Sequence, residues 1–222
     1  MDRLVNLYNQ NSEHFLGKDS PWLKNIRESL VSEIEKNGFP NKKKEIWKYS
    51  NLNHINNVNY KATNFDNNLK VSKDFNQIDL INGVYYIPRS LLIEDKLFLE
   101  KLGKSIDNFK NYFTFNNNYF SNDFIIDINT IFLTEGLSII INNNQQFELT
   151  IKYNNTKDEI TSYVRNIIKV NKNSKLTFIE NFDNTNSQNN FSNIFNIFWL
   201  EEGAKVEHII IQNSQISSNI LY

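Results

Sequence analysis

The 222-residue chain contains no cysteine, and this absence removes several classes of chemistry. Disulfides, thiolate metal sites and cysteine nucleophiles all require the missing side chain. A metal site would need histidine or carboxylate ligands, and the only histidines are His14, His54 and His208. They lie too far apart in the sequence to form a local ligand motif such as two histidines one helical turn apart. We therefore expect no metal-binding residues and no cofactor bound by this chain.

The chain also lacks a net charge of either sign, since 24 Lys and Arg residues face 25 Asp and Glu residues, for a formal charge of -1. Such a balance gives no long-range attraction to a phosphate backbone or an anionic bilayer. The only basic run, Lys42 to Lys44, is followed at once by Glu45 and is expected to be a solvated turn. We expect no nucleic-acid partner.

Long apolar runs are missing as well. The N-terminal residues have no apolar core of signal-peptide length, and no later stretch holds 18 consecutive apolar residues. We expect no membrane association and a cytoplasmic location, or the stroma-like interior of an organelle. Alanine occurs only at Ala62 and Ala204, whereas asparagine is abundant. Asparagine tolerates left-handed backbone, so it is expected at turn positions that glycine usually fills.

Helical periodicity predicts a mainly helical region over residues 1–132. Ser20 and Pro21 predict the start of a helix that Asn37 and Gly38 end. Its buried face is predicted from residues spaced four apart: Trp22, Ile26, Leu30 and Ile34. Further helices are predicted around Leu4, Tyr8 and Phe15, along 93–113 from Ile93 to Phe113, and from Phe120 through Phe124 and Ile128 to Phe132. Two short strands are predicted in 78–87 about the Asn82-Gly83 turn.

Residues 133–222 are predicted to be β structure, because the apolar period changes to two after Gly136. Residues 170–179 superpose on 200–209 at an offset of 30, and 133–139 is a looser third copy. Repeated turn-and-strand units favour a parallel β-helix, although a hairpin-rich sandwich would also give short strands between polar turns. In a β-helix, like positions on neighbouring coils share a face. The expected pairs are Leu176 with Val206 and Phe178 with His208.

The segment 39–52, Phe-Pro-Asn-Lys-Lys-Lys-Glu-Ile-Trp-Lys-Tyr-Ser-Asn-Leu, resembles a signature near the start of SufD proteins, a family of iron-sulfur cluster assembly scaffolds. Segments 82–88, 129–136, 165–180 and 203–212 are similar to the same family, in the same order. The paralogue SufB is similar mainly in the β-helix and generally lacks the Glu-x-Trp-Lys-Tyr motif, so SufD is the better match.

The resemblance implies an α+β fold, in which a helical N-terminal region is followed by the first coils of a right-handed parallel β-helix. It implies a scaffold that is not an enzyme and that acts with SufB and the ATPase SufC. Family members are much longer, so the chain is expected to be an N-terminal portion without the main SufB and SufC contact regions. None of the family's functional positions maps onto it. Whether the truncation is natural stays open.

No catalytic residues are predicted. The adjacent acids Asp158-Glu159 and Glu201-Glu202 lie beside turn signals and point to opposite faces of an extended chain, so they are expected to be solvated. Trp47 and Tyr49 are expected to be packing anchors rather than a ligand platform.

Two alternative functions remain, a carbohydrate-active β-helix protein and a structural module without surviving activity. The first would need a recurrent column of acidic side chains, which the repeat does not contain. If the chain ends as a β-helix, its last strand, from Val206 to Ile211, should be an open edge through which the chain self-associates.

Overall fold

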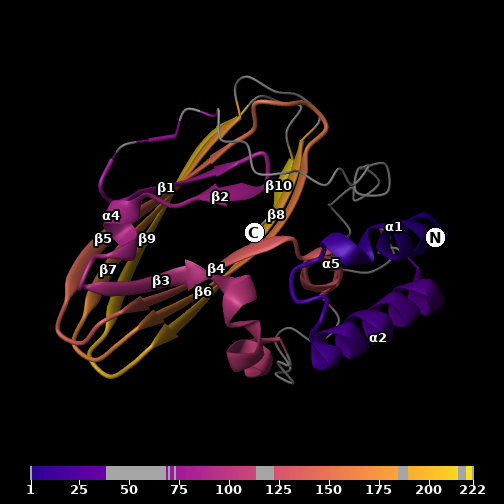
Figure 1. Cartoon of the computed structure of the whole chain (residues 1–222), viewed down its shortest axis with the longest axis horizontal. Coiled ribbons are helices and arrows are strands. Elements are labelled where there is room, and N and C mark those ends of the chain that lie inside the picture. The colour runs from indigo at the N-terminus through magenta and orange to yellow at the C-terminus, as the bar shows by residue number, and fades with distance from the viewer. Residues whose placement is uncertain are drawn as a thin grey trace.

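A computed structural model describes the chain over residues 2–38, 69, 71–72, 74–113, 123–184, 190–214 and 219–221. The segment 39–52, with Trp47 and Tyr49, and also His54 lie outside the described residues. Within the described part the fold is mixed α+β: three helices, α1 (Asp2–Asn11), α2 (Pro21–Asn37) and α5 (Phe124–Phe132), gather on one side of the molecule, the short helix α4 (Arg89–Leu92) lies on the opposite side, and two five-stranded sheets form most of the rest (Figure 1).

The helices are short except for one. They are α1 (Asp2–Asn11), η1 (Ser12–His14), α2 (Pro21–Asn37), α4 (Arg89–Leu92), η3 (Leu102–Lys104), η4 (Ile106–Tyr112) and α5 (Phe124–Phe132). Helices α1, α2 and α5 lie together beside the sheets, with the N-terminus at their outer end (Figure 1). The predicted helices at the N-terminus, over 21–37 and before Phe132 are confirmed, although Phe15 follows the end of α1.

Helix α2 begins at Pro21 and ends at Gly38, as predicted, but two details differ. The Ser20 hydroxyl does not cap the helix and instead donates to the Asp107 carboxylate. The most buried residues of α2 are Leu23, Arg27 and Ile34, so the buried face lies to one side of the predicted stripe. A stripe of apolar residues could not reveal this, because the best-buried residue in mid-helix is an arginine.

The helix predicted over 93–113 is wrong. This segment contains strand β3 (Leu97–Lys101) followed by the two 3₁₀ helices. Leu97 and Leu99 are buried while Phe98, between them, is half-exposed, which is the period of a strand. Pairing of β3 with strand β4 (Glu135–Ile141) supplies long-range hydrogen bonds that override the local helical period.

The strands form two sheets. One sheet has the order β2-β1-β5-β7-β9 and the other the order β10-β8-β6-β4-β3. Their bounds are β1 Gln77–Ile81, β2 Val84–Tyr86, β4 Glu135–Ile141, β5 Gln146–Asn154, β6 Thr161–Val170, β7 Lys175–Asn184, β8 Phe191–Leu200, β9 Lys205–Ser214 and β10 Asn219–Leu221. The predicted hairpin over 78–87 is confirmed, since β1 and β2 pair antiparallel about Asn82 and Gly83, which both have positive φ.

From β4 to β10, successive strands belong alternately to the two sheets, and every pairing among them is parallel. One strand of each sheet, with two turns, therefore makes a unit that repeats about every 30 residues. Phe147 lies beside Leu176, which lies beside Val206, and Phe178 lies beside His208. The predicted stacking of like positions is confirmed.

The turns that directly follow β4, β6 and β8 share one backbone conformation. Asn144, Asn173 and Gly203 occupy equivalent places and all have φ between 57° and 71°. Asparagine thus takes the left-handed turn position twice and glycine once, as expected. The third copy of the repeat is 141–150, because Ile141 pairs with Val170 and Gln146 with Lys175. The copy predicted at 133–139 is wrong, since it leads into β4, in the other sheet.

Of three apolar clusters in the described part of the chain, the smallest is formed by Ile81, Val84 and Tyr86, and the other two hold these layers together. The larger lies between the sheets and includes Leu149, Ile151, Leu176 and Phe178, all fully buried. The second lies between the helices and the outer face of β6 and β8. Its members include Phe15, Ile34, Ile128, Phe132 and Tyr163. Near the helices, β6 and β8 are therefore covered on both faces. Buried polar groups also lie on the face that meets the helices.

Candidate functional site

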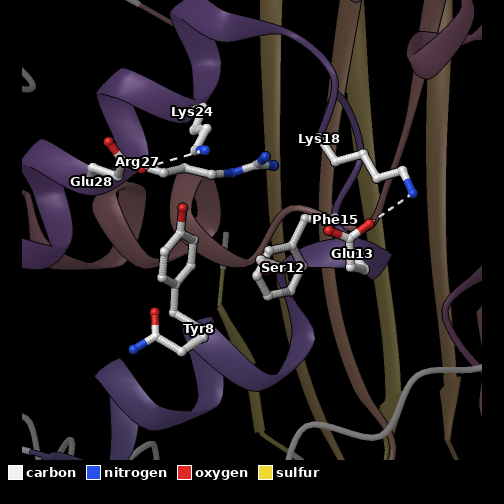
Figure 2. Close-up of a pocket in the computed structure, with 9 residues that line it drawn as sticks. Tyr8, Ser12, Glu13, Phe15, Lys18, Lys24, Arg27 and Glu28 are labelled. Carbon is white, nitrogen blue, oxygen red and sulfur yellow. Dashed lines mark hydrogen bonds and ion pairs between the residues drawn. The ribbon is translucent and has the colours of Figure 1, made fainter.

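A surface pocket of about 220 Å³ lies between α1, η1 and α2 (Figure 2). Its walls carry Tyr8 and Phe15, whose rings stack with centroids 5.9 Å apart, and the Arg27 side chain, which crosses the pocket. The Arg27 guanidinium lies 5.5 Å from the centre of the Phe15 ring. The pocket therefore combines an aromatic floor with a buried cation.

Most of the charged side chains that line this pocket pair with one another. Lys18 Nζ lies 3.0 Å from a Glu13 carboxylate oxygen, and Lys24 Nζ lies 4.0 Å from one of Glu28. Arg27 is only 2% exposed. Its Nε donates to the Thr130 carbonyl at 3.1 Å and its Nη2 to the Leu16 carbonyl at 2.8 Å. The cation's donors are therefore aimed into the fold, and the pocket does not present an open anion-binding site.

A buried polar network lies between the two sheets, and we call it the interior polar network. Its members are Tyr85, Tyr153, Asn166, Glu180, Asn196 and His208. Glu180 is at its centre and is 0% exposed. On β7 it follows Leu176 and Phe178 in the row of side chains that point into the core, so a carboxylate occupies a position that its neighbours fill with apolar groups.

Three side chains from three different strands bond the Glu180 carboxylate. The Tyr153 hydroxyl donates to Oε1 at 2.5 Å and the Asn196 amide donates to Oε2 at 2.8 Å. The Nε2 atom of His208 lies 2.6 Å from Oε2. Which of the two atoms donates in this hydrogen bond is set by the tautomer of the imidazole. A buried charge is tolerated when its acceptor sites are used in this way.

The network continues from Asn196 away from Glu180. The Asn166 amide donates to Asn196 Oδ1 at 2.9 Å, and the Tyr85 hydroxyl donates to Asn166 Oδ1 at 2.9 Å. The backbone N–H of Leu137 adds a second donor to Asn166 at 3.2 Å. Every donor along this chain points toward Glu180, so the aligned amide dipoles favour negative charge on that carboxylate.

Burial sets the state of the two tyrosines in the network. Burial, and after it the nearby charge of Glu180, holds the pKa of Tyr153 well above its ordinary value of 10.0. Burial has the same effect on the pKa of Tyr85, which the hydrogen bond with Asn166 only partly opposes. Both hydroxyls therefore stay protonated near neutral pH and serve as permanent donors.

A second set of buried polar groups joins α5 to the outer face of β6 and β8, and we call it the helix–sheet junction. Its side chains are Arg27, Asn129, Thr130, Arg165 and Asn193. The Asn129 amide donates to the carbonyls of Val164 and Asn193, and the Asn193 amide donates back to the Ile125 carbonyl at 2.9 Å.

Arg165 is the largest fully buried side chain of the junction. Its Nε donates to Asn129 Oδ1 at 3.1 Å and its Nη2 to Thr130 Oγ1 at 2.7 Å. The guanidinium also lies between the rings of Phe113 and Phe195, at 4.5 and 5.1 Å from their centres. Burial, and after it the charge of Arg27, lowers the pKa of Arg165 to about 9, so the group is still a cation at neutral pH.

The histidines and acidic pairs singled out in the sequence have different fates. His14 is exposed, His54 lies outside the described residues, and His208 joins the interior polar network. No histidine lies beside another in the described part. The acidic pairs are solvated, as predicted: Asp158 and Glu159 are exposed in a turn, while Glu201 and Glu202 are bonded to the surface residues Lys169 and Lys172.

Most members of the interior polar network were missed by reasoning from the sequence. One signal could have found Glu180, because it falls at an inward position of an alternating strand, in phase with Leu176 and Phe178. Asn166 and Asn196 are the same residue type at the repeat offset of 30. A polar residue at an inward repeat position predicts a buried hydrogen-bonding partner.

In the part of the chain that the structure describes, no three His, Asp or Glu side chains are grouped so as to hold a metal ion. None of the described helices is long and apolar enough to cross a bilayer.

Comparison with known protein families gives two matches, which together follow the chain almost from end to end. The family model described as "SufBD protein N-terminal region" matches residues 1–153. The model described as "SUF system FeS cluster assembly, SufBD core domain" matches residues 152–220. No curated protein sequence matches the chain. The first model covers the helices and the strands up to β5, and the second covers the repeating parallel strands that follow.

Proposed function

Because the chain belongs to the SufB/SufD family of the SUF system, we propose that it is a scaffold subunit of iron-sulfur cluster assembly that acts with SufB and the ATPase SufC. The family takes part in SUF iron-sulfur cluster assembly. The observation that carries the proposal is the succession of the two family matches along residues 1–220, in the same order as the helical part and the repeating strands.

We propose that the chain is SufD-like rather than SufB-like. The support is the Glu-x-Trp-Lys-Tyr motif of residues 45–49, which resembles SufD and which SufB generally lacks. This motif lies outside the described residues, so the proposal rests on sequence. A genetic test is direct: the chain, or a longer protein that contains it, should restore growth to cells that lack SufD and not to cells that lack SufB.

The repeating strands are, we infer, the first coils of a right-handed parallel β-helix. Alternation of successive strands between two parallel sheets supports this interpretation, as do the register offsets close to 30. A sandwich built from hairpins would pair successive strands antiparallel. The hand follows from the family resemblance, and an experimental structure would determine it.

We propose that the chain is not an enzyme and holds no cofactor of its own. A chain without cysteine has no thiolate to ligate an iron-sulfur cluster, which on this proposal is cargo of the assembled complex. The carbohydrate-active alternative is disfavoured, because the register neighbours Glu148, Thr177 and Glu207 do not form a continuous acidic column. After anaerobic reconstitution, desalting should remove all cluster absorbance from the purified chain.

Capture of partners tests the central proposal. We expect the chain to enter a complex when it is co-expressed with SufB and SufC, and to bind weakly or not at all to SufC alone. The scaffold proposal is wrong if neither SufB nor the SufB–SufC pair is retained by the folded chain or by a longer protein that contains it.

We also propose that this chain self-associates through β9. In the described part of the fold, β9 is the last strand of its sheet, and Ile209, Ile210 and Ile211 are 37% to 47% exposed. An unblunted apolar edge favours strand addition from another chain. Ile210→Lys should shift the oligomer toward monomer with unchanged circular dichroism, whereas the control Ile93→Lys, at an isoleucine remote from β9 in sequence, should not. A concentration-independent wild-type monomer would contradict the proposal.

A further inference from the structure

We propose that Asn37 is a site of spontaneous deamidation, whereas the fold protects Asn82 from the same reaction. Asparagine precedes glycine at only two places in the sequence, Asn37-Gly38 and Asn82-Gly83. The chain therefore contains the same reactive dipeptide in two environments, and the structure decides which of them reacts. The proposal stands independently of the role in iron-sulfur cluster assembly.

The reaction needs water and no other co-reactant. The backbone nitrogen of the glycine attacks the side-chain carbon Cγ of the asparagine, the bond from Cγ to Nδ2 breaks, and ammonia leaves with the proton of the backbone N–H. Water then opens the resulting cyclic imide at either of its carbonyl groups. The products are aspartate or isoaspartate, in which the main chain runs through the former side chain. Glycine favours the attack because it has no Cβ to obstruct the approach.

Asn37 lies where the structure opens most readily. It is the last residue of α2 and is exposed to solvent. In the described part of the fold, a Cβ built on Gly38 would meet no atom within 4 Å, so the space around the dipeptide is open. The Gly38 backbone N–H donates to the Ile34 carbonyl at 2.8 Å, as the terminal hydrogen bond of the helix. Terminal bonds break first when a helix frays, so the Gly38 nitrogen becomes available without wider unfolding.

Asn82 is held away from the reactive geometry. It lies in the tight turn between β1 and β2 and is 5% exposed. Its Nδ2 donates to Thr156 Oγ1 at 2.9 Å, and its Oδ1 accepts from the Thr156 backbone N–H at 2.9 Å. Its own backbone N–H donates to the Asn154 carbonyl at 3.1 Å. The amide group that would have to turn toward the Gly83 nitrogen is therefore held at both of its polar atoms.

The expected difference in rate follows from these hydrogen bonds. Attack at Asn82 requires the release of both side-chain bonds to Thr156, whereas attack at Asn37 requires only the release of the terminal bond of α2. Two hydrogen bonds of ordinary strength lower the population of the reactive form by about tenfold or more. We therefore expect Asn37 to react at least about tenfold faster than Asn82 in the folded chain.

Deamidation changes the C-terminal end of α2. The new carboxylate lies where the helix dipole disfavours negative charge. An isoaspartate also lengthens the main chain just before Gly38, which disturbs the hydrogen bond from Gly38 to Ile34. Ile34 is buried in the same apolar core as Ile128 of α5. Loosening of the last turn of α2 would therefore begin at the edge of that core.

Peptide mapping by mass spectrometry of the full chain tests the proposal. The purified chain is incubated at physiological temperature and mildly alkaline pH, and the deamidated fraction at each position is followed with time. In the folded chain, the peptide that contains Asn37 should acquire the mass of the acid, and the peptide that contains Asn82 should not. In a parallel sample unfolded in urea, the two positions should react at similar rates, because the dipeptide is the same.

Two variants make the comparison specific. Asn37→Gln moves the side-chain carbonyl one carbon further along the side chain, so conversion at this position should stop on the same timescale. Thr156→Val keeps the shape of the side chain but removes the hydroxyl that accepts from Asn82. Conversion at Asn82 should then become about fivefold faster, with conversion at Asn37 unchanged.

Amide hydrogen exchange on Asn37→Asp measures the effect on α2, because this variant carries the new charge on an unaltered backbone. Exchange in the last turn of α2 should become about two- to fivefold faster, while exchange in β5 and β7 stays constant. Unchanged exchange would overturn the effect on α2. The site itself is overturned if Asn82 reacts as fast as Asn37 in the folded chain, if Asn37 reacts only in urea, or if Thr156→Val leaves the rate at Asn82 unchanged.

Discussion

The interior polar network and the helix–sheet junction both bury charge, but they neutralise it in different ways. In the network one carboxylate, Glu180, is hydrogen-bonded to Tyr153, Asn196 and His208. In the junction, Arg165 and Arg27 donate to amide, hydroxyl and carbonyl oxygens, and none of these acceptors is a carboxylate. One region is built around a buried anion and the other around buried cations.

The difference reflects how each region is assembled. Except for Tyr85 of the β1–β2 hairpin, members of the network come from strands that repeat about every 30 residues, so successive coils add partners to the same interior column. The junction joins elements that do not repeat, and Arg27 meets Thr130 across 103 residues of sequence. In the repeat, each coil can add one hydrogen-bond partner to the buried charge. In the junction, the partners come together only when the helices pack on the sheet.

The largest expected effect is the loss of the anion in the network. Glu180→Ala would leave the buried Tyr153 hydroxyl and the Asn196 amide without their carboxylate acceptor, and the partly exposed His208 ring without its partner. Removing one partner of a buried charged group costs about 3–5 kcal/mol of the free energy of unfolding. Urea denaturation followed by circular dichroism measures it. A loss below 1 kcal/mol would mean that the network contributes little.

A smaller effect is expected in the junction. Arg165→Lys keeps the charge but loses the planar fork that reaches Asn129 and Thr130 together. It also weakens the contacts of the guanidinium with the rings of Phe113 and Phe195. We expect a loss of about 2 kcal/mol in the free energy of unfolding. The control is Lys169→Arg on the same strand, at a surface ion pair, which should change stability very little.

The smallest effects are expected at the repeated turns, outside both regions. Gly203 has φ +71°, and a Cβ there would lie 2.3 Å from Asn173 Oδ1, so Gly203→Ala should cost about 1–2 kcal/mol. Asn173→Gly, at the equivalent turn, should change stability by less than about 0.5 kcal/mol, since glycine accepts the same backbone. Thermal unfolding of the two variants checks this ranking. Equal losses would show that the turns are not equivalent.

Part of the buried polar chemistry could be predicted from the sequence and part could not. The pairing of Phe178 with His208 followed from the repeat and is confirmed. The bond between His208 and Glu180 did not follow, because it depends on which strand face points inward and on the reach of a side chain across coils. The burial of Arg27 could not be predicted, because an arginine beside an apolar stripe is expected at the edge of the exposed face of a helix.

By itself, the sequence determined the change from helical to strand period near Gly136, the repeat offset of 30, the left-handed asparagine turns and the family resemblance. These are local or periodic properties, and backbone sterics and the alternation of side chains express them directly. The tertiary structure alone decided that 97–101 is a strand, that Glu180 is solvated by three strands and that two arginines are buried beside α5. Such features depend on contacts between residues remote in the chain, whose free energy exceeds the small local propensities that a sequence displays.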